Sequence, residues 1–283
     1  MSSATQLQLS LTCLFWNVAR RDDLSELVAG LASERGADVL VLAENGADAG
    51  DTLDTLRRLV EPSFVHPTSE QARVHVFGRG EHLDLREVYV DASGRLTVRV
   101  LRYGGAELLL AAAHLVSRLP SWGREDQTAE VRELSQQIRA EEQRRGHART
   151  ILVGDLNMNP FEDGVMQANG LHAMMTKTTA EERSRRVQGR DYPFFYNPMW
   201  GFFGDRTPGP PGTYYYRHSG HLSYEWNILD QVLLRPEVLP LFEDVEIVTK
   251  IGETELVGAN GRPDGKVASD HLPIVFRLGE PPR

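Results

Sequence analysis

The sequence has little cysteine and no long hydrophobic run. Its 283 residues include a single cysteine, Cys13. One cysteine forms no disulfide within the chain, which excludes a disulfide scaffold and a cysteine-rich zinc module. No apolar stretch approaches the roughly 20 residues that a membrane-spanning helix requires, so no membrane span is expected.

The start of the chain lacks the pattern of a secretory signal. A short apolar run extends from Leu9 to Trp16, but no basic residue precedes it and no small-residue cleavage site follows it. We therefore interpret this run as a first strand and expect a cytoplasmic location.

Composition excludes several protein classes. The chain is 41% hydrophobic and 25% charged, with 25 glycines and 15 prolines. These fractions exclude a disordered, collagen-like or low-complexity chain, and the length suffices for one large domain or two modest ones. The formal charge of -9 argues against a protein that coats nucleic acid through a broad basic face. It permits an enzyme whose acidic centre holds a divalent metal.

Hydrophobic periodicity predicts alternating strands and helices in the first part of the chain. Leu11 to Val18 and the segment ADVLVLAEN, which reaches Glu44, indicate buried strands. Asp23 and Glu26 resemble a capping box ahead of a helix that Gly36 would end. A second amphipathic helix is expected from Asp51 to Val60.

Strands dominate the middle of the chain. Short segments separated by glycine-containing turns predict antiparallel strands at Val74–Phe77, Leu83–Val90, Leu96–Tyr103 and Glu107–Leu115. The charged segment Arg124–Arg145 keeps one apolar stripe, which predicts a surface helix packed on a sheet. Further strands are expected at Thr150–Gly154, Ile228–Leu234, Val245–Ile251 and Leu272–Leu278.

The stretch from Phe161 to Tyr224 loses this periodicity. It holds a group of arginines between Arg183 and Arg190, and the aromatic runs YPFFYNPMWGFF and YYY. No repeat and no composition break suggests a linker, so we expect residues 1–283 to form one domain with a loop-rich, substrate-side stretch at 161–224. The aromatic side chains could stack on bases or, as the simpler interpretation, cover an edge of the core.

Polar residues recur where predicted buried strands end. Asn17, Glu44 and Asp155 with Asn157 follow such strands, and Asp230 lies within NILDQVLL. Ligands commonly bind at strand ends, so these side chains could converge on one site. Taken singly, each is more often a turn former or helix cap.

Taken in order, these pieces resemble the endonuclease/exonuclease/phosphatase superfamily, also called the deoxyribonuclease-I-like fold. The matching segments are FWN (15–17), LAEN (42–45), AHL (113–115), GDLN (154–157), LDQVL (229–233) and SDH (269–271). One departure concerns the residue before Glu44, which is usually Gln in the family and is Ala43 here. The carboxylate itself is retained.

The resemblance implies a four-layer α/β/β/α sandwich with two mainly antiparallel sheets and helices on the outer faces. It also implies a metal site. Mg2+ prefers carboxylate and amide oxygens, which suits Asn17 and Glu44 as ligands and Asp270 as a further candidate, with Mn2+ as a substitute ion.

The resemblance assigns catalytic roles to five residues. Asp155 would orient or deprotonate the attacking water, and Asn157 would donate a hydrogen bond to a phosphate oxygen. His271, its ring held by Asp230, would contact the phosphate or transfer a proton. His114 would be the general acid beside the leaving group. Alternatively, His114 is a buried structural histidine and His271 caps a strand start.

Three function classes remain open at this point. The first is a Mg2+-dependent phosphodiesterase that cleaves nucleic acid as an endonuclease or exonuclease. The second is a phosphatase or phosphodiesterase for a small or lipid phosphate, such as an inositol phosphate or sphingomyelin. The third is a non-catalytic binding module, which the intact set of polar residues disfavours. We expect a nucleic acid substrate.

Overall fold

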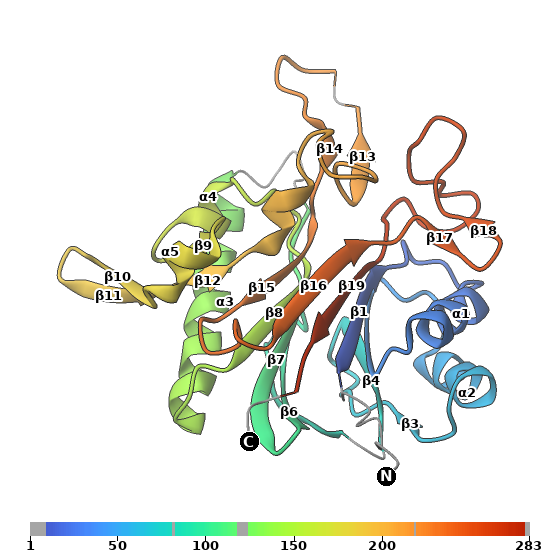
Figure 1. The fold of residues 1–283 in the computed structure, drawn as a ribbon, viewed down its shortest axis with the longest axis horizontal. Coiled ribbons are helices and arrows are strands. Elements are labelled where there is room, and N and C mark those ends of the chain that lie inside the picture. Colours follow the sequence, from blue (N-terminus) through green and yellow to red (C-terminus); the bar gives the residue numbers. More distant parts are fainter. Residues whose placement is uncertain (1–9, 81–82, 118–123, 218, 281–283) are drawn as a thin grey trace, which may run out of the picture.

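Two β-sheets packed face to face make up the centre of the molecule. The computed structural model describes residues 10–80, 83–117, 124–217 and 219–280. Helices lie on the outer faces of the two sheets, so the described residues form the four layers α/β/β/α (Figure 1). The expected fold class is thereby confirmed.

The first sheet has six strands in the order β16-β19-β1-β2-β4-β3. Its strands are β1 (Leu11–Asn17), β2 (Val39–Ala43), β3 (Phe64–Val65), β4 (Val74–Arg79), β16 (Phe242–Ile247) and β19 (Ile274–Leu278). Strands β1 and β2 run parallel, and their neighbours in this sheet pair antiparallel. Helices α1 (Ser25–Arg35) and α2 (Ala49–Leu59) pack on the outer face.

The second sheet has seven strands in the order β5-β6-β7-β8-β15-β12-β9. Its strands are β5 (Asp84–Val90), β6 (Leu96–Tyr103), β7 (Ala106–His114), β8 (Thr150–Asp155), β9 (Ala173–Met174), β12 (Phe195–Tyr196) and β15 (Asp230–Leu234). Strands β7 and β8 run parallel. Helix α3 (Arg124–Arg145) covers the outer face through Val131, Leu134 and Ile138.

Strand β1 shows why the first apolar run is continuous. Side chains of a strand alternate between the two faces of its sheet. Cys13 and Phe15 pack between the two sheets, while Leu14 and Trp16 pack under the outer helices. Both faces of β1 are therefore buried, as in strands covered on each side, and every residue of the strand is buried.

The ends of helix α1 differ in how well the sequence predicted them. Gly36 adopts the left-handed conformation and ends the helix, as expected. The predicted capping box at Asp23 is wrong. The N-cap is Leu24, which has no side-chain cap, and the Asp23 carboxylate instead forms an ion pair with Arg21.

The stretch predicted as loops contains short elements. They are α4 (Asp163–Met166), β9, α5 (Lys177–Glu181), β10 (Ser184–Val187), β11 (Arg190–Pro193), β12, η1 (Pro198–Phe202) and β13 (Tyr214–Tyr216). Phe194, Phe195 and Met199 are buried in the core, so part of the aromatic run covers the second sheet as the simpler interpretation expected. The remaining short strands are β14 (Glu225–Asn227), β17 (Lys250–Ile251) and β18 (Thr254–Glu255).

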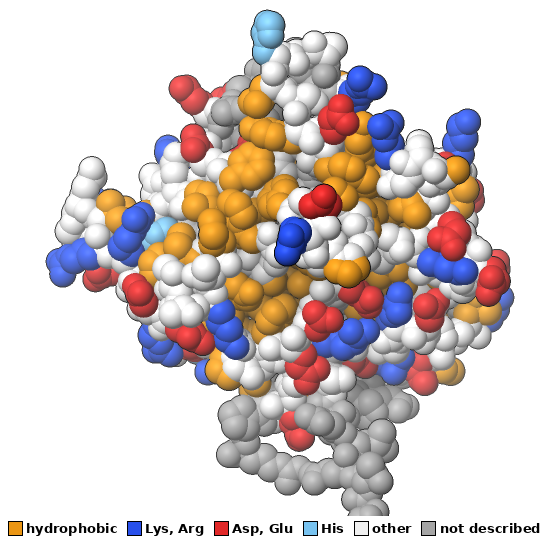
Figure 2. Space-filling model, turned by 45° about the horizontal axis from the view of Figure 1, so that its top comes forward, with side chains coloured by type: hydrophobic (Ala, Val, Ile, Leu, Met, Phe, Trp, Pro, Cys, Tyr) orange, Lys and Arg blue, Asp and Glu red, His pale blue; other side chains and the backbone are white. Residues whose placement is uncertain are grey.

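The surface carries charges of both signs. On the face shown in Figure 2, acidic and basic side chains lie interspersed around a central hydrophobic area. This face has no broad basic region, in keeping with the net charge of -9. In the described ranges, no helix combines the length and the apolar character needed to cross a membrane.

Candidate active site

Five strand ends meet at one edge of the sandwich. Because β1 and β2 are parallel, Asn17 at the end of β1 lies beside Ala43, which directly precedes Glu44. In the other sheet, His114 pairs with Asp155 at the ends of parallel strands β7 and β8. Asp230 begins antiparallel strand β15 opposite Asp155. The topology thus gathers residues that are distant in the sequence at the upper end of the two sheets, below β13 and β14 (Figure 1).

A cavity of about 980 Å³ opens at this edge. It is lined by Asn17, Ala19, Arg20, Glu44, Ser117, Asp155, Asn157, Asn159, Glu162, Tyr214, Tyr216, Leu222, Ser223, Tyr224, Asn227, Leu229, Asp270 and His271. Polar and acidic groups and three tyrosines share this lining.

Asp155 is the centre of the hydrogen-bond network. One carboxylate oxygen accepts the side-chain amide of Asn17 at 2.9 Å, and the other accepts the backbone N–H of Asn157 at 2.8 Å. The residue is buried. Burial and the neighbouring carboxylate of Asp230 raise the pKa of Asp155, which makes its carboxylate a stronger base than a solvated aspartate.

His271 and Asp230 form a buried pair. The Nδ1 atom of His271 lies 2.8 Å from one Asp230 oxygen and 3.1 Å from the other. Burial opposes protonation, but the Asp230 carboxylate and its hydrogen bond raise the pKa of His271 to about 10. The ring is therefore cationic at neutral pH. Its Nε2 atom has no hydrogen-bond partner among the described residues, and the side chain faces the cavity.

Glu44 lines the same cavity and carries a stable negative charge. His114 Nε2 is 3.4 Å from one of its oxygens and 3.8 Å from Asp155. The hydrogen bond from His114, together with the charges of His114 and Arg20, lowers the pKa of Glu44 to about 2 despite partial burial. Glu44 is thus ionised at neutral pH, with about a quarter of its side chain exposed (26%).

Two of the sequence-predicted site residues adopt unfavourable backbone conformations. Glu44 has φ of 48° and Asn157 has φ of 50°. Left-handed conformations are costly for residues other than glycine and persist where the surrounding structure requires them, often at functional sites. At Asn157 the turn directs the backbone N–H to Asp155 and the side-chain amide to the carbonyl of Leu115.

Close packing of strands β7 and β8 explains why a glycine, Gly154, precedes Asp155. A Cβ atom at this position would lie 1.9 Å from the carbonyl oxygen of Ala113 on strand β7. Strands β7 and β8 approach closely here, and that approach sets the positions of His114 and Asp155. Only glycine fits without separating the strands.

We expect Gly154→Ala to destabilise the fold and to disturb the site. Overpacking of this kind lowers the free energy of unfolding by about 1–3 kcal/mol, which urea unfolding would measure. Gly30→Ala is the matched control, because its Cβ would meet only Ile251 at 3.7 Å and helix α1 should gain about 0.5–1 kcal/mol. Equal stability of Gly154→Ala and the wild type would contradict the close approach.

The donor groups at the cavity fit a hard divalent cation. Asp155, Asp230 and His271 offer ligand atoms within 4.8 Å of one another, but the hydrogen bond between His271 and Asp230 and the amide donors to Asp155 satisfy this buried group. Glu44 differs, since it lines the cavity and is partly exposed, with Arg20 and His114 in contact with its two carboxylate oxygens. With the amide oxygen of Asn17 it offers the oxygen ligands that Mg2+ prefers.

The structure brings most of the sequence-predicted site residues together. Asn17, Glu44, Asp155, Asn157, Asp270 and His271 line the cavity, and Asp230 lies buried behind His271. Asp270 is exposed on the cavity wall. His114 is not among the residues that line the cavity, because it lies between Glu44 and Asp155.

Sequence reasoning missed three supporting residues. The Ser269 hydroxyl donates to the carbonyl of Asn17 at 2.7 Å and accepts the N–H of His271. Thr213 accepts the Asp230 N–H through its hydroxyl, and the ring of Tyr214 lies 4.6 Å from that of His271. Ser269 stands in the SDH segment and could have been found there. Tyr214 opens the aromatic run YYY, but the sequence did not place it beside His271, and nothing in the local pattern marked Thr213.

One protein-family model matches most of the chain. A model of the Endonuclease/Exonuclease/phosphatase family matches residues 14–271. A search of curated proteins gave no match.

Several solved structures share the fold. A humanized TDP2 from D. rerio matches with a TM-score of 0.60 and 16% identity, covering 95% of this chain and 98% of that one. D. rerio TDP2 in complex with a single-strand DNA product matches with a TM-score of 0.58 and 17% identity, with the same coverage of each chain. An endonuclease/exonuclease/phosphatase family protein from Bacteroides thetaiotaomicron matches with a TM-score of 0.59 and 13% identity, covering 98% of this chain and 100% of that one.

Proposed function

The chain belongs to the endonuclease/exonuclease/phosphatase family, and from this we propose that it is a Mg2+-dependent hydrolase that cleaves phosphodiester bonds in nucleic acid. One observation carries the proposal. The carboxylate of Asp155 and the cationic ring of His271 line the same cavity, with Asp230 behind the ring. A base and a cation placed together are what attack of water on a phosphate ester requires.

The proposed reaction is direct attack by water. Asp155 orients a water molecule and takes its proton as the oxygen bonds to phosphorus and the bond to the leaving oxygen breaks. The raised pKa of Asp155 favours this transfer. Cationic His271 and the amide of Asn157 stabilise the charge that builds on the phosphate oxygens. The leaving oxygen receives a proton from an acid or from solvent.

Glu44 and Asn17 would hold the divalent metal, with Asp270 as a further candidate ligand. When bound, Mg2+ neutralises part of the acidic cluster and polarises a phosphoryl oxygen. The low pKa of Glu44 keeps this carboxylate ready to bind a cation at neutral pH. An acidic protein can in this way accept an anionic substrate.

The role of His114 is testable through the leaving group. If His114 is the general acid, His114→Gln should slow the cleavage of esters with poor alkyl leaving groups about 10²-fold or more. Cleavage of 4-nitrophenyl esters should slow much less, because 4-nitrophenolate leaves without a proton. A similar loss for both esters would make His114 a positioning residue for Glu44 and Asp155. The ratio of the two kcat/KM losses measures the difference.

The cavity wall supports a nucleic acid substrate. Tyr216, Leu222 and Tyr224 line the cavity, and these residues are 55%, 55% and 44% exposed. The ring of Tyr224 packs on Phe161 at 4.9 Å, which holds it in place. Exposed aromatic side chains beside a phosphate site can stack on unpaired bases. The D. rerio TDP2 structure that holds a single-strand DNA product has the same fold.

A comparison of substrates tests this proposal. We expect metal-dependent cleavage of end-labelled single-stranded DNA or RNA, and a roughly 10-fold or greater loss of affinity in a Tyr216→Ala/Tyr224→Ala variant, since one stacked base contributes about 1–3 kcal/mol. Tyr89→Ala on strand β5 is a control outside the cavity. Preferred hydrolysis of an inositol phosphate or sphingomyelin would instead assign the alternative substrate class.

A further inference from the structure

Arg20 lines the cavity while most of its side chain is exposed. It follows strand β1 by three residues and lines the cavity beside Glu44. Its Nε atom donates to a Glu44 oxygen at 3.1 Å, and its side chain is 83% exposed. In the described part of the chain, the two terminal nitrogens of its guanidinium have no hydrogen-bond or ion-pair partner.

The backbone holds Arg20 in an unfavourable conformation. Ala19 and Arg20 have φ of 51° and 59°, two consecutive left-handed residues without glycine. The Arg20 N–H donates to the carbonyl of Glu44 at 2.8 Å, and a Cβ at Gly46 would lie 2.2 Å from the Arg20 carbonyl oxygen. Strain of this kind costs of order 1–3 kcal/mol per residue and clusters at active sites and at positions that hold a ligand.

The neighbouring Arg21 shows what a structural arginine looks like in this loop. Its Nη1 atom donates to the carbonyls of Gly265 and Ala268, and its guanidinium pairs with Asp23. These contacts tie the loop after β1 to the segment that carries Ser269, Asp270 and His271. The Arg20 side chain makes no such connection, and its one polar contact among the described residues is with the carboxylate proposed to hold the metal.

We propose that Arg20 is a substrate-binding residue that uses its free terminal nitrogens to hold a phosphate oxygen. A planar guanidinium suits phosphate, and the acidic groups of the cavity need a compensating cation to admit an anion. The inference rests on the proposed function. In the protein without substrate, the same guanidinium neutralises Glu44 and thus competes with a divalent cation for that carboxylate.

The test separates these two consequences. Arg20→Ala removes a positive charge near Glu44, so we expect the protein alone to bind Mg2+ or Mn2+ about fivefold more tightly by calorimetry. With a cleavable phosphodiester at saturating metal, KM should rise about 10-fold while kcat changes less, because a contact to substrate is lost. Arg20→Lys should bring KM part of the way back to the wild-type value, since the lysine ammonium keeps the positive charge but not the planar guanidinium.

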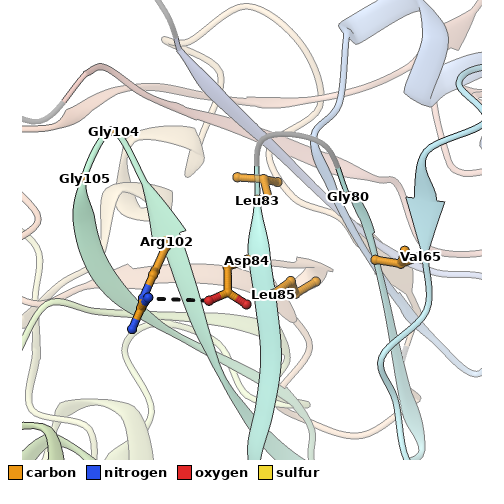
Figure 3. A pocket seen from close by; sticks show the side chains of 8 residues that line it. All are labelled: Val65, Gly80, Leu83, Asp84, Leu85, Arg102, Gly104 and Gly105. Atoms are coloured by element: carbon orange, nitrogen blue, oxygen red, sulfur yellow. Dashed lines mark ion pairs between the residues drawn. The ribbon is translucent and has the colours of Figure 1, made fainter.

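Arg102→Ala is the matched control. Arg102 is 60% exposed and forms an ion pair with Asp84 (Figure 3). It lies beside the turn that starts strand β7, whereas His114 ends that strand at the cavity. The control makes the same change of charge far from the site, so its metal affinity and KM should match the wild type.

A second variant excludes a backbone effect. Arg20→Gly relieves the left-handed strain, so a shift of metal affinity and KM shared by Arg20→Ala and Arg20→Gly belongs to the side chain. Unchanged metal affinity, or unchanged KM in an active enzyme, would overturn the role of Arg20. A wild type that binds the metal but cleaves no phosphodiester would contradict the proposed function instead, and calorimetry would still show whether Arg20 acts on Glu44.

Discussion

Asp155→Asn is expected to lower kcat about 10³-fold for any phosphodiester that the wild type cleaves, because general-base catalysis contributes about 10² to 10⁴. The amide keeps the shape of the carboxylate but cannot accept a proton at neutral pH. The wild-type carboxylate accepts hydrogen bonds from Asn17 and Asn157, so its position before reaction is well defined. Steady-state kinetics would measure the loss.

The fold should tolerate this change. In the wild type, burial and the charge of Asp230 both oppose ionisation of Asp155, so removing the charge relieves a repulsion while one acceptor is lost. The free energy of unfolding should change by less than about 1.5 kcal/mol. Asp84→Asn, with its exposed carboxylate next to Arg102, is the matched control and should keep full activity. A fully active Asp155→Asn enzyme would remove Asp155 from the mechanism.

Glu44→Gln is expected to weaken metal binding on the order of 10²-fold or more, since one negative charge in contact with a divalent cation is lost. The wild-type carboxylate is ionised at neutral pH because its pKa is about 2. At low metal concentration activity should be nearly absent, and high concentrations should restore part of it. Calorimetric titration of the protein with Mg2+ or Mn2+ gives the affinity directly.

Glu26→Gln is the control for this experiment. Glu26 lies on helix α1 with its side chain 76% exposed and pairs with Arg58. It is not among the residues that line the cavity, so its metal titration should match that of the wild type. If Glu44→Gln binds the metal as tightly as the wild type, the ligand assignment is wrong and the buried group around Asp155 becomes the alternative metal site.

The sequence pointed to residues that the structure brings together because they stand in short ordered segments. GDLN and SDH carry Asp155, Asn157 and His271, and the pairing of strands β7, β8 and β15 brings them together. Hydrophobic runs also predicted most strands, since β1 and β8 are buried on both faces. Where burial determines an element, local pattern suffices.

Other parts depend on contacts that no local pattern reveals. The prediction of a capping box at Asp23 is wrong because the Asp23 carboxylate forms an ion pair with Arg21. Arg21 in turn donates a hydrogen bond to the carbonyl of Gly265, which is more than 240 residues away in the sequence. Thr213 reaches Asp230 from a stretch without periodicity. Arg20 followed a recognised segment but showed its importance only through backbone strain and its contact with Glu44.

The most direct test of the account is hydrolysis of bis(4-nitrophenyl) phosphate, which needs no knowledge of the natural substrate. Release of 4-nitrophenolate would be followed with Mg2+, Mn2+ or EDTA for the wild type, Asp155→Asn and Asp84→Asn. We predict metal-dependent release by the wild type and by Asp84→Asn, its abolition by EDTA, and its loss in Asp155→Asn. Hydrolysis that EDTA leaves unchanged, or that Asp155→Asn retains in full, would contradict a metal-dependent phosphodiesterase site at this cavity.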